Sequence, residues 1–395
     1  MVEFPLMSDN VSKESIQTLV KFLSQDPLPQ FTNGPMVRKF EKEWGEWLGC
    51  TLNTMVGSGS AANQISLMIL RHLYPQGGKV LVPVIGWVSD VSSILQAGFE
   101  PVFVDVNLHN LAVNVEDLAR KVDKDCRALI LVHALGLNGL SDDLLNLCKE
   151  HNLLLIEDCC ESHSAKFKNQ KIGNFGDINN FSFFYAHHLV SLAEGGMIGT
   201  KNKDYHNLIR AYRSHGMNRE VPDEQFKNKV IADNPTLNPD FIFLGAAMNG
   251  RSQEVNAIVA SEGLLRLDSD NAQRIANMER FMSKLDGNKY FLDFDLTGQC
   301  SYAFILILKN ASFSNRNIIE RELKAHGIEA RRGTSGGGNL TRQPLLKLWG
   351  YNFNPKDYPI GEYLSDFGWY LGNYPKLSFE KVDKLVGILN NIRLE

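Results

Sequence analysis

The chain of 395 residues lacks several features that would commit it to a class of protein. Its six cysteines show neither zinc-site spacing nor the clustered thiolates of an iron–sulfur centre, so we expect no metal and reduced, buried thiols. No apolar run approaches the roughly 18 residues of a membrane helix. The N-terminus has no basic stretch before an apolar core, so we expect no secretion signal and a cytoplasmic protein.

A strong charge of either sign is also missing. The net charge is -4 at pH 7 and the sequence pI is near 6.2, so we expect no surface for nucleic acid or an anionic membrane. Hydrophobic residues make up 44% of the chain, enough to bury a large core. A helix predicted over 253–285 links a large domain at 1–265, which begins with a helical segment, to a small C-terminal domain at 266–395.

Lysine is absent between Lys171 and Lys201, and this gap contains the sequence NNFSFFYAHHLVSLAEGGMIGT at 179–200. The residues at 181–184, mostly apolar, predict the end of a buried strand, Glu194-Gly195-Gly196 predict a turn, and 197–199 predict the next strand. The loop between these strands contains two adjacent histidines, His187 and His188.

Short runs rich in Val, Ile and Leu alternate with helical stretches through the first half of the chain. Strands are predicted at 79–84, 101–105, 128–132 and 153–156. This alternation predicts a mainly parallel sheet with helices on both faces, whose ligands bind at the carboxyl ends of the strands. Trp87, Asp158 and Ser182 all fall at such ends.

A turn of small residues at 57–63 joins a short strand to a helix predicted at 64–73. The free N–H groups and positive dipole of a helix N-terminus suit a phosphate, which makes Gly59 and Ser60 candidate ligands. An ordinary tight turn between a strand and a helix has the same local pattern.

The joint order of this turn, Trp87, Glu157-Asp158, FSF at 181–183 and EGG at 194–196 resembles the DegT/DnrJ/EryC1 family of sugar aminotransferases over about 5–390. The resemblance implies an α/β fold-type I enzyme dependent on pyridoxal phosphate (PLP). It further implies a mainly parallel seven-stranded sheet, a small C-terminal α+β domain, and a homodimer with shared active sites.

The resemblance also assigns expected roles to individual residues. The cofactor phosphate would be bound by Gly59, Ser60 and Ser182, with Trp87 stacked on the ring and Asp158 at the ring nitrogen. Glu161 would face the 3-hydroxyl of the cofactor, and Asn249 would reach it from the neighbouring subunit. His215 and Arg219 are candidate substrate contacts, and Arg331 is a candidate for binding the carboxylate of an amino donor.

His187 occupies the position at which this family has the lysine that binds PLP covalently, the sixth residue after Phe181. Counting back from EGG points to His188 instead. We prefer His187 because the count from FSF is tied to Ser182 at the phosphate. Imidazole can move protons near neutral pH but cannot replace lysine in the covalent link.

A small branch of the family carries this change and implies a 3-dehydratase that uses PLP and pyridoxamine phosphate (PMP). Its expected substrate is a nucleotide-linked 4-keto-6-deoxy sugar, a GDP-linked hexose or heptose, for dideoxysugar synthesis in lipopolysaccharide or capsule. L-glutamate would regenerate PMP. Two alternatives stay open: an aminotransferase with a displaced lysine, and an inactive family member that acts as a sensor.

Overall fold

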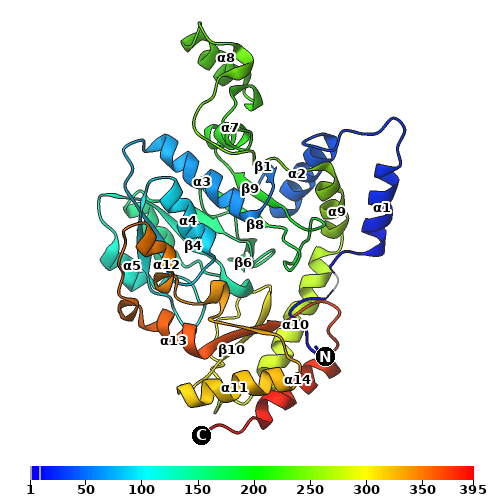
Figure 1. The fold of residues 1–395 in the computed structure, drawn as a ribbon, viewed down its shortest axis with the longest axis vertical. Coiled ribbons are helices and arrows are strands. Elements are labelled where there is room, and N and C mark those ends of the chain that lie inside the picture. Colours follow the sequence, from blue (N-terminus) through cyan, green and yellow to red (C-terminus); the bar gives the residue numbers. More distant parts are fainter. Residues whose placement is uncertain (1, 9) are drawn as a thin grey trace.

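A seven-stranded sheet forms the centre of the computed structural model, which describes residues 2–8 and 10–395 (Figure 1). Its order is β1-β9-β8-β5-β4-β2-β3. These strands are β1 (Leu52–Val56), β2 (Lys79–Pro83), β3 (Glu100–Val104), β4 (Cys126–Val132), β5 (Leu154–Asp158), β8 (Ile178–Ser182) and β9 (Gly196–Thr200). Only β9 runs antiparallel to its neighbours, so the predicted mainly parallel sheet is confirmed.

Both faces of this sheet are buried, which explains why its strands are almost continuously apolar. Val80 and Val82 of β2 belong to one core cluster, with residues of helices α3 (Gly59–Leu73) and α4 (Val88–Gln96). Leu81, between them, belongs to a second cluster with residues of α2 (Pro35–Leu48) and α6 (Asp142–Glu150). Successive side chains of a strand point to opposite faces, so each strand supplies both cores.

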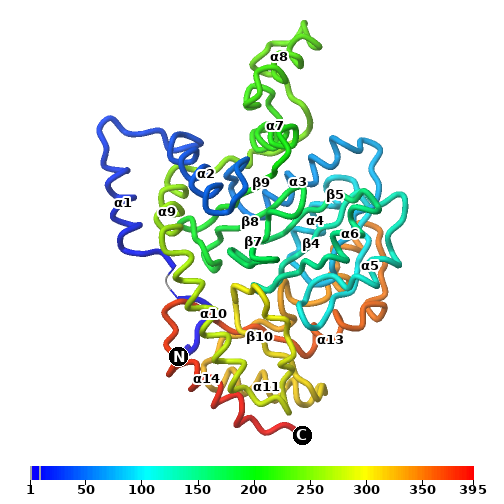
Figure 2. Tube along the Cα trace, turned by 180° about the vertical axis from the view of Figure 1, so that it is seen from behind, coloured from blue at the N-terminus to red at the C-terminus, as the bar shows by residue number. Residues whose placement is uncertain are grey.

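The helix predicted over 253–285 is two helices in the structure, so that prediction is wrong. Helix α9 (Glu254–Leu264) packs against α1 (Lys13–Leu23) and α2, whereas α10 (Leu267–Lys284) packs against α14 (Phe379–Asn391) (Figures 1 and 2). Arg266 pairs with Asp270 at 2.7 Å and donates a second hydrogen bond to the Asn10 carbonyl. These contacts fix Arg266 at the break, where the chain changes direction.

The C-terminal part contains the expected mixture of helix and strand. Its antiparallel sheet has the order β10-β12-β11 and is formed by β10 (Ala303–Ile307), β11 (Ala330–Arg332) and β12 (Gly368–Gly372). Helix α11 (Phe313–Ala325) lies beside this sheet (Figure 1). The proposed domain boundary at 265/266 coincides with the break between α9 and α10, and remains a prediction.

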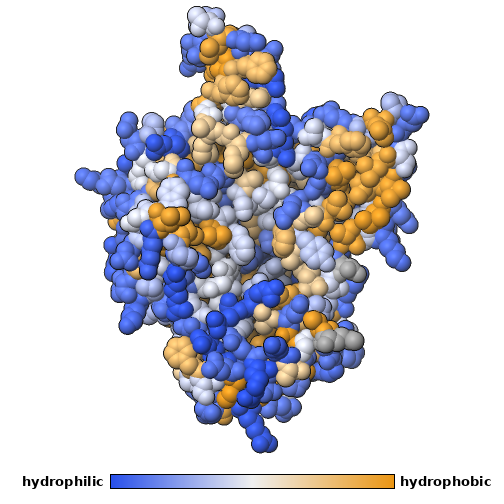
Figure 3. Space-filling model, viewed as in Figure 1, coloured by the Kyte–Doolittle hydropathy of each residue, from blue (hydrophilic) through white to orange (hydrophobic). Residues whose placement is uncertain are grey.

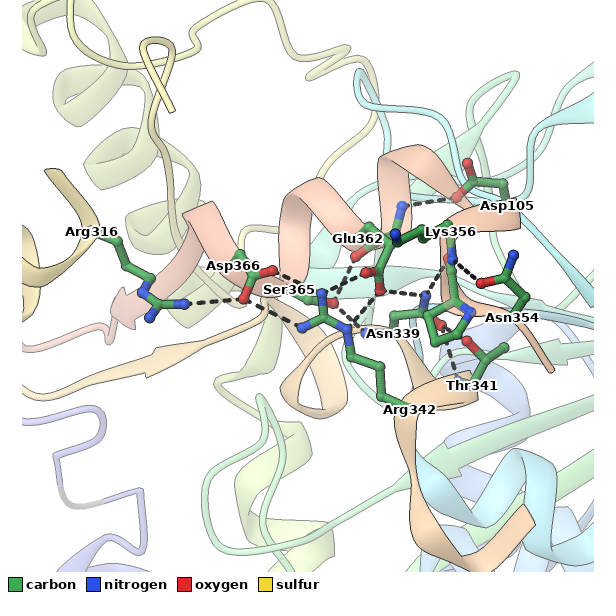
Figure 4. Close-up of polar contacts among 12 residues, drawn as sticks. Asp105, Arg316, Asn339, Thr341, Arg342, Asn354, Lys356, Glu362, Ser365 and Asp366 are labelled. Carbon is green, nitrogen blue, oxygen red and sulfur yellow. Dashed lines mark hydrogen bonds and ion pairs between the residues drawn. The ribbon is translucent and has the colours of Figure 1, made fainter. Parts of the chain in front are cut away.

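Helix α13 (Pro359–Phe367) connects the two parts of the molecule (Figure 4). At its N-terminus, Ile360 and Gly361 donate N–H groups to the Asp105 carboxylate at 3.0 and 2.8 Å. Farther along, Glu362 and Asp366 bind Arg342 at 2.6 and 2.8 Å. The glycine-rich segment at 333–340 is therefore followed by an anchored segment.

No helix among the described residues is long and apolar enough to cross a bilayer. This finding agrees with the absence of a long apolar run in the sequence.

Replacing Trp44 should destabilise the large domain, because its fully buried ring packs edge-on against Phe181 and Phe183 with centroids 5.0 Å away. We expect Trp44→Ala to lower the free energy of unfolding by about 3–5 kcal/mol, the usual cost of truncating a buried aromatic residue. Urea unfolding followed by circular dichroism measures the change. Trp349→Ala is the matched control, since Trp349 is half exposed and should change stability by less than about 0.5 kcal/mol.

Candidate functional site

The N-terminus of α3 lies against the end of β8, and only glycine fits at the contact. A Cβ atom on Gly59 would lie 2.6 Å from the Ser182 Cβ. The Ser58 hydroxyl caps the helix by accepting the Ala61 N–H at 3.0 Å. Within the described chain, Gly59 and Ser60 donate no backbone hydrogen bond. These free N–H groups beside Ser182 form a site that suits a phosphate.

Asp158 is the last residue of β5 and is held by two donors. Asn63 in α3 donates from Nδ2 to Oδ2 at 2.9 Å, and the N–H of Cys160 donates to Oδ1 at 2.9 Å. The side chain is 4% exposed. This buried carboxylate stands at the same edge of the sheet as Gly59 and Ser182, as expected for the end of a strand parallel to β1 and β8.

Glu161 lies just beyond Asp158 and contacts both parts of the molecule. Its Oε2 accepts the N–H of Leu135 at 2.9 Å, and Leu135 has the left-handed φ of 53°. Burial raises the pKa of Glu161 to about 7, although hydrogen bonds from Leu135 and from Ser335 in the C-terminal part act to lower this pKa. The Glu161 carboxyl group can therefore donate or accept a hydrogen bond near neutral pH.

Trp87 immediately precedes α4 and is 57% exposed. The 3₁₀ turn Ser335–Gly337 covers the backbone beside it so closely that a Cβ on Gly336 would lie 1.7 Å from the Gly86 carbonyl oxygen. The glycine-rich segment thus forms a wall next to an indole ring whose face remains available for stacking.

The imidazole of His187 is half-buried, and its Nε2 has no hydrogen-bond partner among residues 2–8 and 10–395. Its Nδ1 lies 3.0 Å from the Ser182 carbonyl, which can only accept, so Nδ1 carries the hydrogen and Nε2 has the lone pair. Asn10 holds the loop by donating from Nδ2 to the His187 carbonyl at 2.7 Å. Burial lowers the pKa of His187 to about 4, opposed by the Ser182 carbonyl and the charge of Asp158.

His188 points into the protein interior instead. It is 5% exposed, and its Nε2 lies 3.3 Å from the Cys300 carbonyl. Its ring packs against His163 and Tyr302, with centroids 5.3 and 5.7 Å away. The half-buried position and free Nε2 of His187 favour it over His188 as the base.

Arg331 lies on β11 with an exposed side chain and forms no ion pair with any described residue, whereas its neighbour Arg332 pairs with Glu320 at 2.8 Å. Arg331 stands opposite Tyr370 of β12, the ring of Tyr370 lies 6.3 Å from that of Tyr302, and Tyr302 lies 5.5 Å from the imidazole of His187, so Arg331 is on the side of β11 that faces the histidine loop. The guanidinium of Arg331 is therefore available to a carboxylate.

The remaining candidates lie along a different segment. Asn249 is exposed, and its Oδ1 accepts the N–H of Arg251 at 3.2 Å. The His215 N–H donates to the Met248 carbonyl, and Arg219 stacks on Phe241. No hydrogen bond or ion pair in the described chain joins any of the three to Asp158 or His187, so their roles remain predictions.

Sequence reasoning missed Asn63, Asp90, His163 and Ser335. Asn63 and Asp90 are both buried and joined by a 2.7 Å hydrogen bond from the Asn63 amide, although they belong to different helices. The sequence does contain one indication of this contact: each residue is polar but lies on the apolar face of its helix, and a buried polar group needs a hydrogen-bond partner. Nothing in the sequence around Ser335 indicates that it lies near Glu161, because its position depends on how the two parts of the molecule pack.

This arrangement, a helix N-terminus, Ser182, Trp87 and Asp158 at the carboxyl edge of a seven-stranded, mainly parallel sheet, defines a fold-type I PLP-dependent enzyme. The donors at 58–60 suit the cofactor phosphate and the Asp158 carboxylate suits its ring nitrogen, so the residues present fit PLP. The chain belongs to the DegT/DnrJ/EryC1/StrS aminotransferase family, which matches residues 10–390.

Relatives with a stated activity extend over the whole chain. It is 28% identical to GDP-4-keto-6-deoxy-D-mannose 3-dehydratase of Escherichia coli O55:H7, over 98% of this chain and 100% of that protein. It is 26% identical to the enzyme of the same name from Yersinia pseudotuberculosis, over 98% of each.

Solved structures of an enzyme with this activity are also similar to the chain. A crystal structure of GDP-4-keto-6-deoxymannose-3-dehydratase with bound GDP-perosamine matches with a TM-score of 0.87 and 28% identity, over 98% of this chain and 100% of that one. Another, with a trapped PLP-glutamate geminal diamine, matches with a TM-score of 0.87 and 26% identity, over the same shares. The family and fold inferred from the sequence are confirmed.

His187 should remain uncharged well below the pH at which histidine usually titrates, because burial lowers its pKa to about 4. Its resonance in a ¹⁵N-histidine NMR titration should therefore stay that of the neutral form from pH 7 to pH 5, with the Nδ1–H tautomer. His187→Asn assigns the signal, and the exposed His326 is the internal control. A midpoint above pH 6 for His187 would contradict the prediction.

Proposed function

We propose that the protein is a PLP/PMP-dependent 3-dehydratase of a GDP-linked 4-keto-6-deoxy sugar, a hexose or heptose. The reaction removes the hydroxyl group at C3 and yields a 3,6-dideoxy-4-keto sugar, with L-glutamate regenerating PMP from PLP. One feature carries the proposal: by the count from FSF, His187 takes the position of the family's lysine, and its ring lies at the same sheet edge as Gly59, Asp158 and Ser182. The relatives named above carry out the same dehydration.

When bound, PMP supplies an amino group for the sugar ketone and a ring that accepts electrons. The N-terminus of α3, with Ser182, would hold the phosphate through N–H groups and a hydroxyl. Asp158 would hold a proton on the ring nitrogen, because an adjacent negative charge favours the protonated form. Trp87 would cover one face of the ring, and Glu161 would contact its 3-hydroxyl.

His187 would act as a base without a covalent link to the cofactor. Its neutral Nε2 can take a proton from the carbon next to the cofactor amino group, while the Nδ1–H remains on the Ser182 carbonyl. The same nitrogen, once protonated, can return a proton to the departing C3 hydroxyl. A lysine at this position would instead protonate C4 of the sugar and complete a transamination.

The amino donor needs a site for its carboxylates, and the proposed one is Arg331, an arginine that forms no ion pair with the described residues and faces the histidine loop. His215 and Arg219 are proposed sugar-nucleotide contacts. A reducing compartment suits the enzyme because all six cysteines are free thiols, and we include the cytoplasm in the proposal.

A homodimer is part of the same proposal. Exposed apolar side chains gather over α1 and the turn that follows it, including Ile16, Val20, Leu28 and Phe31 (Figure 3). Such a patch suits contact with another copy of the chain. Asn249 is exposed, as a residue that reaches into a neighbouring active site must be.

His187→Asn should lower kcat/KM for dehydration of GDP-4-keto-6-deoxymannose by about 10²–10⁴-fold, the usual contribution of general acid–base catalysis. Wild type should convert glutamate to 2-oxoglutarate with PLP and release ammonia with the sugar. His188→Asn is the matched control and should stay within about tenfold of wild type, because His188 faces Cys300.

Borohydride treatment followed by mass spectrometry separates the alternatives. Wild type with PLP should gain no covalent label, whereas His187→Lys should be labelled at that residue. A label on a wild-type lysine would support an ordinary aminotransferase with a displaced lysine. Absence of both glutamate turnover and dehydration would leave the sensor interpretation.

A further inference from the structure

A second carboxyl group is buried beside Asp158. Asp90, in the first turn of α4, is 0% exposed. The Asn63 amide nitrogen donates to Asp90 Oδ1 at 2.7 Å and to Asp158 Oδ2 at 2.9 Å, so one side chain holds both acids. No described residue donates a hydrogen bond to Asp90 Oδ2.

The orientation of this amide is fixed from the other side. Asn63 Oδ1 accepts a hydrogen bond from Asn180 Nδ2 at 2.8 Å, so Asn63 Nδ2 must face the two carboxyl groups. The same nitrogen also lies 3.1 Å from the Ser89 hydroxyl. Two N–H hydrogens are thus shared among three oxygen atoms, which leaves the two acids short of donors.

The groups that face Asp90 are acidic. Asp158 and Glu161 lie on the opposite strand and loop, Cys160 lies beside Asp158, and no lysine or arginine pairs with Asp90 among the described residues. Two ionised carboxylates this close in a buried site repel each other, so such a pair holds one proton in common. Asp158 accepts the Cys160 N–H in addition to the shared Asn63 amide, which makes Asp90 the favoured holder of the proton.

We propose that Asp90 is a positioning residue that stays protonated at neutral pH and donates a hydrogen bond to Asp158, thereby limiting the basicity of Asp158 toward the cofactor. The effect on the cofactor rests on the proposed function, whereas the shared proton is a property of the protein alone. Burial, and then the charge of Asp158, raise the pKa of Asp90 well above its usual range. The simpler interpretation, an ionised aspartate that caps α4 through the Trp87 N–H, requires an unpaired negative charge in the core.

The first experiment measures the folding stability of the protein without cofactor at several pH values. If Asp90 keeps its proton in the folded protein but releases it in the unfolded chain, the pKa of Asp90 is higher in the folded state. The folded state then loses stability as pH rises from the unfolded pKa toward the folded pKa. Asp90→Asn has the same shape and no such proton, so its folding equilibrium constant relative to wild type should grow by about tenfold per pH unit between pH 5 and 7. Urea unfolding measures both constants.

Asp117→Asn is the matched control, because Asp117 occupies the first turn of α5 (Val115–Lys121) and its pKa is lowered by Lys121 and the Asp105 N–H against its burial. A lowered pKa contributes stability above the unfolded pKa, so this variant should lose stability at neutral pH, the opposite sign. A ratio for Asp90→Asn that does not change with pH would overturn the shared proton.

The second experiment uses PLP and its absorbance. Asparagine can still donate to Asp158 and valine cannot, so Asp90→Asn should keep the pH midpoint of bound PLP within about 0.3 unit of wild type. Asp90→Val should raise that midpoint by about one unit, because Asp158 loses a donor and its charge then favours the protonated ring more strongly. Equal midpoints in the two variants would reduce Asp90 to a helix cap and overturn the positioning role.

These readouts separate the inference from the proposed function. If the ratio of folding constants between Asp90→Asn and wild type depends on pH but the protein dehydrates no sugar, the proposed function is wrong and the shared proton is still supported. If Asp90→Val does not fold, the comparison of Asp90→Asn with wild type still decides the protonation state.

Discussion

The amide group of Asn63 is the contact on which the candidate site depends. Its oxygen accepts from Asn180 in β8 and its nitrogen donates to Asp90 in α4 and Asp158 in β5, so one side chain of α3 joins three other elements. The N-terminus of α3 can approach Ser182 because Gly59 has no side chain. A phosphate site and a carboxylate are thereby held at a fixed separation by one helix.

The proposed chemistry depends on one side chain, that of His187. The loop at 183–188 is held by the Ser182 carbonyl, by Asn10 and by the packing of His188 against Cys300. A lysine in such a loop would carry the cofactor, whereas an imidazole leaves it free to exchange between its two forms. Burial keeps that imidazole neutral, which is the form a base requires.

The sheet could be predicted from the sequence because strands buried on both faces have an unmistakable composition, as in β2 and β4. Asp158, Ser182 and Trp87 could be placed because they follow such strands directly. The contacts of Asn63 with Asp90 and Asp158 could not, since these residues lie 27 and 95 positions apart and no local pattern joins them. The break between α9 and α10 was missed because the contacts of Arg266 with Asn10 are tertiary.

Asn10 forms two of the contacts described above at once. Its carbonyl accepts from Arg266 at the break between α9 and α10, and its amide donates to the carbonyl of His187. The break between the two helices and the histidine loop are therefore joined through a single buried residue. One residue thus sets the position of the histidine loop relative to the start of α10.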